Sequence, residues 1–595
     1  MLNKLFTLFL FGLSLAHAGE SPLVNQLAGH PSPYLALHGK DPVVWQEWNA
    51  ETLARAKREN KPLLVSVGYF ACHWCHVMQR ESFSDPAIAA LLNSRFIPVK
   101  VDRELNLALD ADLLAFTRQL HGVAGWPVNV FVTPEGYPFY AVLYQPPDKF
   151  KTVSEKLDHH WRVDSVGVRA AAQAATPARD IAANPIAADA RDLAMLERRF
   201  LEAALNEADA LLGGFGAVSK FPNVAKLRAL LDLQARSPEP RLREFLLLTL
   251  DNMARLGLHD PVNGGFFRYT TDPDWHTPHF EKMLYDNAQL ALLYARAAEV
   301  LKRPDYRDHA HETLDFLLEV LGTREGGFRT SASALDSQGR EGGAYLWRPA
   351  ELRKRLTPEQ VRLVRRVWGT GSHFDLGDLP MEQVPPSAAE RPLLAAAHAR
   401  LKAAGRMRDL PRDGKLNAGL NGLALSAFSL AGRGVPKYEQ AARRLRDFID
   451  AGLLRNGQLL KSRVGKNVFA DAELDDYAYL AQGLLDHAGA FDDAGSRVLA
   501  DTLLRQAWDR FFTPEGWRRE THPLLATAAS HAALPDEATP SPSATLIRVS
   551  LNRPGTAPPE ALNRALAHAT RSALADPLSH PGILAVLRAR FAPAQ

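Results

Sequence analysis

Cysteine is almost absent from this chain of 595 residues, which contains only two, at positions 72 and 75. A fold held together by several disulfides is therefore excluded, because such frameworks need more than one pair. An excess of one charge is also absent, since 70 basic residues face 67 acidic residues and the net charge is +3. This balance argues against a broad nucleic-acid footprint and a polybasic membrane patch. We expect proteins or small molecules as partners, and no nucleic acid.

Apolar runs long enough to cross a membrane are missing as well. The chain starts with a single basic residue, Lys4, followed by an apolar run over residues 5–15 and then Ala16-His17-Ala18. The run is shorter than the ~20 residues of a membrane helix, and the small residues fit a cleavage site. We therefore predict a signal peptide over residues 1–18, a secreted or periplasmic mature protein, and no membrane association after cleavage.

The remaining chain is long enough for more than one domain. Its hydrophobic content of 46% supports two or more cores. Residues 171–190 are rich in alanine and proline and have no apolar face, as is typical of a linker. We predict a first domain over residues 19–170 and a second over residues 191–595.

The two cysteines lie in the motif Cys72-His73-Trp74-Cys75-His76. Three chemistries use such a motif: a redox dithiol, half of a zinc site, and covalent haem attachment, for which a histidine follows the second cysteine. The apolar run before the motif, residues 62–69, is typical of a buried strand, and no helix breaker follows Cys75. Cys72 is therefore expected at the first turn of a helix. There, free amide groups and positive charge from His73 and His76 would lower its pKa below the usual ~8.5.

The elements around the motif are predicted in the order β-α-β-α-β-β-α, behind a helix that Asn49 caps. A proline, Pro127, opens the third strand. The predicted strands are 63–69, 96–102, 128–132 and 139–143, and the predicted helices are one from Cys72 onward, 87–93, 108–120 and 149–161.

This order, with Cys-x-x-Cys at the first strand-to-helix junction, resembles the thioredoxin plan. More specific runs are Ser32-Pro33-Tyr34-Leu35, Lys61-Pro62, Cys72 to Met78, Glu81-Ser82-Phe83, Lys100-Val101-Asp102-Arg103-Glu104 and Gly125-Trp126-Pro127. Together they resemble the thioredoxin-like, uncharacterised-domain family that includes spermatogenesis-associated protein 20, over nearly the whole chain. The resemblance implies a multi-domain fold: an α/β thioredoxin-like domain followed by an all-α (α/α)6 toroid similar to glycosidases and sugar epimerases.

The resemblance to thioredoxins also implies roles for individual residues. Cys72 would be the attacking thiolate and Cys75 the resolving thiol. Pro127 would be cis and would face the cysteines to guide the substrate. Further residues expected to support the redox site are His73, Trp74, His76 and Trp126.

The other uses of the cysteine pair remain as alternatives. Haem attachment is disfavoured, because the flanking strands would fill a thioredoxin core instead of a haem pocket. A zinc site would need two further ligands from His73, His76 and His121. A buried structural bridge is also compatible with the motif. We expect neither a cofactor nor a metal.

The second half changes to long segments with helical periodicity, and Gly-Gly-Phe recurs at 213–215, 264–266 and 326–328. Spacings of roughly 50–60 residues indicate a repeat of helical pairs. Roughly twelve helices would form six hairpins. Closing them into a toroid would bury all inner faces and place the glycine-rich loops at its mouth.

One stretch of this half, residues 272–287, concentrates polar and aromatic groups. If a helix begins near Phe280, then Glu281 and Tyr285 share one face. Histidine, carboxylate and aromatic hydroxyl groups at a toroid mouth suit acid-base chemistry on a sugar. The same residues could instead be core and capping residues. The candidate toroid site comprises Trp275, His276, His279, Glu281, Tyr285, Asp286, Asn287, Asp336 and Asn421.

Three functions are compatible with these patterns. The first is an exported protein that exchanges thiols and disulfides with a protein or small-molecule substrate. The second is a carbohydrate-active or saccharide-binding toroid with an accessory thioredoxin-like domain. The third is a non-catalytic binding scaffold, favoured by Gly419-Leu420-Asn421-Gly422, which lacks the aromatic residue that the family usually has before the asparagine.

Overall fold

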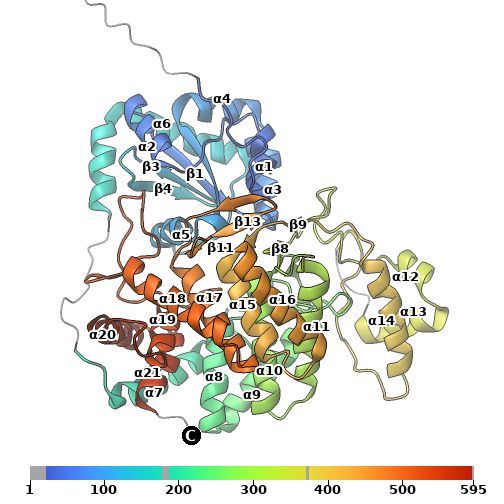
Figure 1. Cartoon of the computed structure of the whole chain (residues 1–595). Coiled ribbons are helices and arrows are strands. Elements are labelled where there is room, and N and C mark those ends of the chain that lie inside the picture. The colour runs from blue at the N-terminus through green and yellow to red at the C-terminus, as the bar shows by residue number, and fades with distance from the viewer. Residues whose placement is uncertain (1–21, 177–185, 370–373, 593–595) are drawn as a thin grey trace, which may run out of the picture.

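The computed structural model describes residues 22–176, 186–369 and 374–592. The predicted signal peptide and the centre of the predicted linker lie outside these ranges. Figure 1 shows a mixed α/β part above a larger helical part, with a small helical insertion at one side. Among the described residues, no helix is both long and apolar enough to cross a bilayer.

The N-terminal part has the predicted thioredoxin-like plan. Its sheet has the order β2-β1-β3-β4, with β1 parallel to β2 and antiparallel to β3. Val65 of β1 lies opposite Val99 of β2 and Val130 of β3. The strands are β1 (Leu63–Gly68), β2 (Ile97–Asp102), β3 (Val128–Val132) and β4 (Pro138–Val142).

Both faces of this sheet are covered, which explains why its central strands are almost continuously apolar. On one face, Val65 and Val67 pack with α2 (Ala50–Glu59) and α5 (Leu107–His121). On the other, Leu64 belongs to the large core. The helices of the N-terminal part that contribute to that core are α3 (His73–Met78), α4 (Pro86–Arg95) and α6 (Pro147–Ala174). Shorter helical segments of this part are α1 (Pro33–Leu37), η1 (His38–Lys40), η2 (Gln79–Phe83) and η3 (Arg103–Leu105).

Capping residues begin two of these helices. The Asn49 side chain accepts a hydrogen bond from the Thr52 amide at 2.9 Å and caps α2. Asp85 caps α4, with Pro86 at its first position. Helix α6 differs from the prediction, because it continues past Trp161 to Ala174 with a kink at Asp164. Its alanine-rich end favours the helix over a linker.

The C-terminal part is a closed (α/α)6 toroid. Each of six inner helices packs against the next, and α21 packs against α8 to close the ring. The inner helices are α8 (Val224–Arg236), α10 (Leu284–Val300), α15 (Ala418–Leu430), α17 (Leu474–Phe491), α19 (Pro542–Leu551) and α21 (Gly582–Phe591). The outer helices are α7 (Ala190–Glu207), α9 (Pro240–Arg255), α11 (Asp305–Phe316), continued by η4 (Leu317–Leu321), α16 (Pro436–Gly452), α18 (Ala494–Phe511) and α20 (Pro559–Ala575).

Inner helices α15 and α17 approach closely where two glycines meet. A Cβ on Gly483 would lie 2.3 Å from the Gly422 carbonyl oxygen, so neither position has room for a side chain. The family-type Asn-Gly pair at 421–422 is therefore explained by packing at this crossing.

The second and third Gly-Gly-Phe repeats are structural turns fixed by asparagines of the inner ring, whereas the Gly214 amide of the first repeat donates to the Thr249 hydroxyl at 2.9 Å. The Asn287 side chain accepts from the Phe266 amide at 2.7 Å and donates to the Phe266 carbonyl at 3.1 Å. Asn421 makes the same pair of bonds to Phe328, at 2.8 and 3.0 Å. Both asparagines also donate to the carbonyl four residues earlier. The amide groups of these two predicted site residues therefore hold the fold together.

Short strand pairs lie mostly at the end of the toroid that faces the sheet, as Figure 1 shows. The pairing gives two three-stranded sheets, β7-β8-β9 and β10-β13-β14. These strands are β5 (Tyr269–Thr270), β6 (Pro278–His279), β7 (Lys282–Met283), β8 (Ser331–Ala332), β9 (Arg412–Asp413), β10 (Leu416–Asn417), β11 (Leu454–Arg455), β12 (Gln458–Leu459), β13 (Ser462–Val464), β14 (Asn467–Phe469), β15 (Phe512–Thr513) and β16 (Gly516–Trp517).

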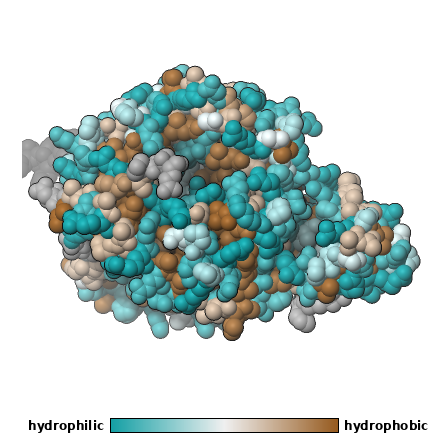
Figure 2. Space-filling view, turned by 90° about the horizontal axis from the view of Figure 1, so that it is seen from below, coloured by the Kyte–Doolittle hydropathy of each residue, from teal (hydrophilic) through white to brown (hydrophobic). Residues whose placement is uncertain are grey.

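An insertion with its own core projects from the toroid between β8 and β9. It contains α12 (Pro349–Arg355), α13 (Pro358–Trp368) and α14 (Arg391–Gly405), which bury Trp347, Val364 and Leu401 among them. Figure 2, viewed from below, shows this insertion at one side of a face on which hydrophilic and hydrophobic residues are interspersed. The sequence patterns did not predict these helices.

Candidate functional site

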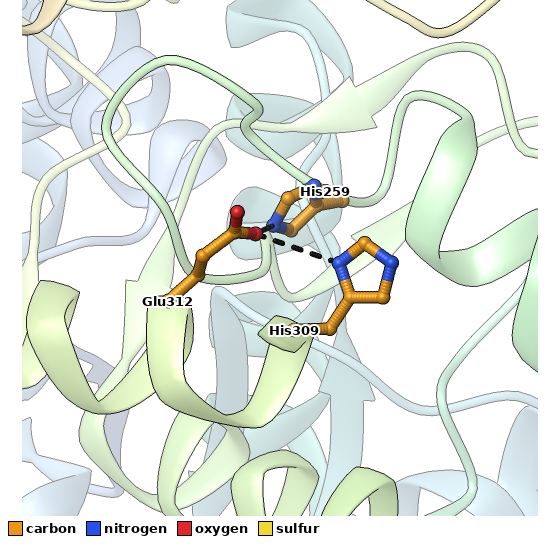
Figure 3. Close-up of side chains that lie close together, drawn as sticks. All are labelled: His259, His309 and Glu312. Carbon is orange, nitrogen blue, oxygen red and sulfur yellow. Dashed lines mark ion pairs between the residues drawn. The ribbon is translucent and has the colours of Figure 1, made fainter. Parts of the chain in front are cut away.

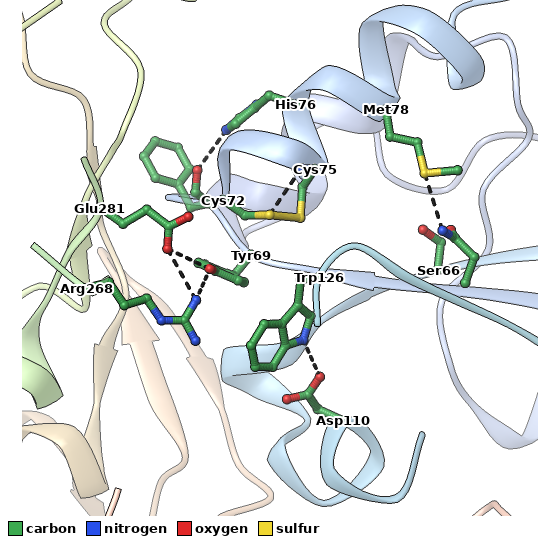
Figure 4. The surroundings of a disulfide bond; sticks show 12 residues. Ser66, Tyr69, Cys72, Cys75, His76, Met78, Asp110, Trp126, Arg268 and Glu281 are labelled. Atoms are coloured by element: carbon green, nitrogen blue, oxygen red, sulfur yellow. Dashed lines mark hydrogen bonds and ion pairs between the residues drawn. A yellow bond between two sulfur atoms is a disulfide. The ribbon is translucent and has the colours of Figure 1, made fainter. Parts of the chain in front are cut away.

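The two cysteines form a disulfide at the start of helix α3, directly after strand β1 (Figure 4). Cys72 is the N-cap, and its Sγ accepts a hydrogen bond from the Cys75 amide at 3.1 Å. The predicted position of Cys72 is thus confirmed. Both residues are deeply buried, with 2% and 1% of their surfaces exposed.

The Trp126–Pro127 peptide bond is cis, as the resemblance implied. The Trp126 ring meets the Tyr69 ring edge-on at 5.7 Å, and its Nε1 donates to Asp110 at 2.7 Å. The Arg103 guanidinium lies over the Trp126 ring at 4.1 Å and donates to Asp110 at 3.0 Å. These contacts fix Trp126 where the thioredoxin-like part meets the toroid.

The toroid covers the disulfide through a buried polar cluster. The Tyr69 hydroxyl donates to Glu281 Oε2 at 2.6 Å, and Arg268 pairs with Glu281 at 3.3 Å and also contacts the Tyr69 hydroxyl. Figure 4 shows this cluster beside Cys72. Glu281 lies between β6 and β7, because α10 begins only at Leu284. It therefore does not share a helix face with Tyr285, and it anchors the toroid to the redox motif.

A second contact covers the motif from the loop that follows β8. The Ala334 amide donates to the Ala71 carbonyl at 3.4 Å, and Glu341 accepts from His279 at 2.8 Å and pairs with His73 at 3.4 Å. The predicted site residue Asp336 shapes this loop, since it accepts from the Arg340 amide at 3.0 Å. We name residues 333–343 the covering loop.

The histidines of the motif differ from the prediction in their charge. Burial lowers the pKa of His73, although Glu341 works in the opposite direction. Burial also lowers the pKa of His76, whose Nε2 bonds to the Phe70 carbonyl at 2.8 Å. Neither side chain therefore supplies the positive charge that was expected beside Cys72. Burial opposes protonation of His279 too, but the hydrogen bond to Glu341 raises its pKa.

Three other predicted residues lie apart from any shared site. Trp275 is fully buried and donates to the Leu212 carbonyl at 3.0 Å, so its ring offers no face to a sugar. His276 points outward and pairs with Asp274 at 3.0 Å. Trp74 is 40% exposed and its ring lies 4.9 Å from that of Tyr144, on the outer surface.

A cavity of about 350 Å³ lies between the two parts, and Tyr285 and Asp286 from α10 line it. We name it the interdomain cavity. The predictions missed most of its charged lining, because those residues lie far apart in the sequence. The charged and aromatic lining residues are Arg103, Glu104, Asp110, Arg118 and Trp126 from the thioredoxin-like part, and Phe221, Arg268, Tyr285, Asp286, Asp475, Tyr479, Arg519 and Glu537 from the toroid.

Several polar atoms of the interdomain cavity have no hydrogen-bond partner among the described residues, namely Tyr285 Oη, Asp286 Oδ2 and Asp475 Oδ2. Burial raises the pKa of Asp286 to about 7, even though Arg268 and Arg103 oppose this shift. Burial raises the pKa of Tyr285 to about 12. The cavity thus offers buried hydrogen-bonding groups and a carboxyl group that can gain or lose a proton near neutral pH.

The fold and the site define a class: a thioredoxin-like domain whose Cys-x-x-Cys disulfide is docked against an (α/α)6 toroid. A family model for DsbH-type thioredoxins, described as "Protein of unknown function, DUF255", matches residues 24–178. Spermatogenesis-associated protein 20 of Mus musculus is 31% identical over 554 residues, which cover 82% of this chain and 70% of that protein. The Homo sapiens protein is 31% identical over 565 residues, covering 83% and 72%. The chain belongs to the family of spermatogenesis-associated protein 20.

A similar solved structure is a GH76 α-mannanase of Bacteroides thetaiotaomicron. It has 11% sequence identity and a TM-score of 0.40, and the match covers 67% of this chain and 95% of the other.

Proposed function

We propose that this chain is an exported thiol-disulfide oxidoreductase with Cys72 and Cys75 as its reactive pair. The observation that supports this most strongly is the hydrogen bond from the Cys75 amide to Cys72 Sγ at the start of α3. In the reduced protein, the same amide and the helix N-terminus would stabilise a thiolate on Cys72. The N-terminal residues 1–18 support export.

The exchange proceeds in two steps. The Cys72 thiolate attacks one sulfur of a substrate disulfide, forms a mixed disulfide, and releases the first substrate thiolate, which takes up a proton. The Cys75 thiolate then attacks Cys72 Sγ and releases the second substrate thiolate. The protein loses two electrons as its disulfide forms, and the substrate gains them as two thiols. The reverse sequence oxidises a substrate dithiol.

Access to Cys72 requires the toroid contacts to open. Both cysteines lie beneath the covering loop, and an attacking sulfur must reach Sγ along the S–S axis. The contact that holds the loop to the motif is the backbone hydrogen bond from the Ala334 amide to the Ala71 carbonyl. The substrate is accordingly a small thiol or disulfide, or a protein segment that displaces the covering loop.

A redox titration of the purified full chain tests this function. After reduction, Cys72 should react with iodoacetamide faster than Cys75, and at a pH below the usual thiol pKa of ~8.5. Peptide mass mapping measures each rate, and equilibration with glutathione gives the reduction potential. In denaturant the two rates should become equal, because the helix start is lost. Slow and equal labelling of the folded protein would contradict the proposal.

A second function, binding of a saccharide, is favoured by the interdomain cavity. Its size is in the range of small-molecule sites. Tyr285 Oη and Asp286 Oδ2 lack hydrogen-bond partners among the described residues, and sugar hydroxyls both donate and accept hydrogen bonds. The Trp126 ring adds an aromatic surface from the other domain. Both halves of the chain would contribute to one ligand site.

Replacing Asp286 with asparagine should stabilise the protein at pH 8 and weaken any saccharide binding. The folded-state pKa of about 7 lies above the unfolded value of ~3.9, so the wild type loses stability as the pH rises from about 4 to 7. The gain in melting temperature should therefore be larger at pH 8 than at pH 5. The control variant Asp409→Asn, at an exposed position, should change the melting temperature little at either pH. An equal gain at both pH values would contradict a buried, titrating Asp286.

A further inference from the structure

A group of three metal-ligating side chains lies apart from both sites described above. His259 is in the loop after α9, and His309 and Glu312 are on α11, three residues apart and thus on one helix face. Figure 3 shows the three side chains converging. Glu312 Oε2 lies 3.7 Å from His259 Nε2 and 3.5 Å from His309 Nδ1. One ligand atom of each residue lies within 4.8 Å of the others.

The two histidine nitrogens that face this point are buried without a hydrogen bond. His259 is only 3% exposed, and neither its Nε2 nor His309 Nδ1 has a hydrogen-bond partner among the described residues. A buried polar atom without a partner destabilises the fold unless something else satisfies it. Two such atoms aimed at the same carboxylate indicate a missing common partner with positive charge.

The set of donor groups suits a metal ion. Two imidazoles and one carboxylate, each offering one ligand atom here, are the ligand set of many zinc sites with three protein ligands.

We propose that His259, His309 and Glu312 bind a divalent transition-metal ion, with Zn²⁺ as the best-fitting ion. Tetrahedral Zn²⁺ with bonds of about 2.0–2.1 Å places its ligand atoms roughly 3.3 Å apart. The separations of 3.5 and 3.7 Å between Glu312 Oε2 and the two histidine nitrogens are close to this value, and the two nitrogens themselves lie within 4.8 Å of each other. The bound ion would tie α11 to the loop that carries His259.

The fourth coordination position is open to solvent or to a further ligand. The three residues line a cavity of about 530 Å³ between the toroid and the insertion, which His398 of α14 also lines. His398 Nε2 bonds to the Val262 carbonyl at 3.0 Å, so this histidine packs the insertion against the same loop. Three protein ligands with an accessible fourth position are typical of zinc sites that hold an exchangeable water.

Calorimetric titration of the metal-stripped, disulfide-oxidised full chain with ZnCl₂ tests the proposal. We expect one tight Zn²⁺ per chain and a higher melting temperature with Zn²⁺. Glu312→Gln keeps the shape of a side chain that is 49% exposed, so this variant should fold. Glu312→Gln should weaken Zn²⁺ binding by more than roughly 10–100-fold, the effect of removing a residue that only hydrogen-bonds to a metal ligand. Co²⁺ should give the intense visible absorption of a tetrahedral ion, and Glu312→Gln should remove it.

The matched control is His311→Asn, on the same helix but packed against the Tyr438 ring at 5.3 Å. This variant should bind Zn²⁺ like the wild type. Asp272, Asp274 and His276 form a second, more exposed group, and binding there would be unaffected by Glu312→Gln. The proposal is overturned if Zn²⁺ does not bind, or if Glu312→Gln binds it with unchanged stoichiometry and affinity.

Discussion

Replacing Cys75 with serine is expected to trap Cys72 in a mixed disulfide with its substrate and to abolish turnover. The first step needs only the Cys72 thiolate, which the backbone amide of residue 75 would still stabilise in the variant. The second step needs a thiolate at position 75, and a serine hydroxyl cannot attack a disulfide under these conditions. The adduct should survive non-reducing electrophoresis and add the mass of one substrate.

The matched control for the trap is Cys72→Ser. This variant loses the same disulfide and should show a similar change in stability, but it has no attacking sulfur at the helix start. Adducts on Cys75 should be rare, because that residue lies inside α3 and not at its N-cap, where a thiolate is stabilised. Equal adduct formation by both variants would refute the assignment of Cys72 as the nucleophile.

The redox motif is the part of the molecule most accessible to sequence reasoning. An apolar strand before the motif and a segment without helix breakers after it predicted that Cys72 begins a helix. In the structure, Cys72 is the N-cap of α3. These signals are local, because hydrophobic periodicity and capping act within one or two turns. The charge of His73 and His76 could not be predicted, since burial by the toroid lowers both pKa values.

Local sequence patterns cannot predict the interdomain cavity or the contacts between the two parts. Tyr69 and Glu281 are 212 positions apart in the sequence, and their hydrogen bond exists only because the two parts dock. Helix α12, with seven residues, and the ten-residue helices α19 and α21 are too short for a periodicity of 3.6 to stand out. Asn287 and Asn421 are of a residue type that often binds ligands, and the sequence does not reveal that their side chains bond to the backbone of turns.

Replacing Lys415 with methionine should destabilise the protein by about 3–5 kcal/mol, the typical result of removing one partner from a buried ion pair. Lys415 Nζ contacts Asp102 and Asp413 at 2.6 Å and Glu104 at 3.1 Å, and all four side chains are buried. Asp102 ends strand β2 and Glu104 follows it, whereas Lys415 belongs to the toroid side. The lysine therefore neutralises carboxylates from both sides of the docking surface.

The size of this loss should depend on pH. Burial opposes ionisation of Glu104, but Lys415 outweighs it and lowers the pKa of Glu104. A lowered folded-state pKa contributes stability above the unfolded value, which is lost as the pH falls through the folded value. The difference between wild type and Lys415→Met should therefore shrink as the pH falls below the unfolded glutamate value of ~4.3. Lys437→Met is the control, because Lys437 is half-exposed, and its pair with Asp315 should contribute at most about 1 kcal/mol.

Lys415→Met should also make the disulfide easier to reduce. The ion cluster helps to hold the toroid against β2, and the same docking buries Cys72 beneath the covering loop. Weaker docking increases the population of opened molecules, and reduction by dithiothreitol follows that population when opening is fast. The rate of thiol appearance at pH 8 should rise well above that of wild type and of Lys437→Met. If Lys415→Met loses stability but keeps the wild-type reduction rate, then the toroid does not control access to Cys72, and substrates reach it by another path.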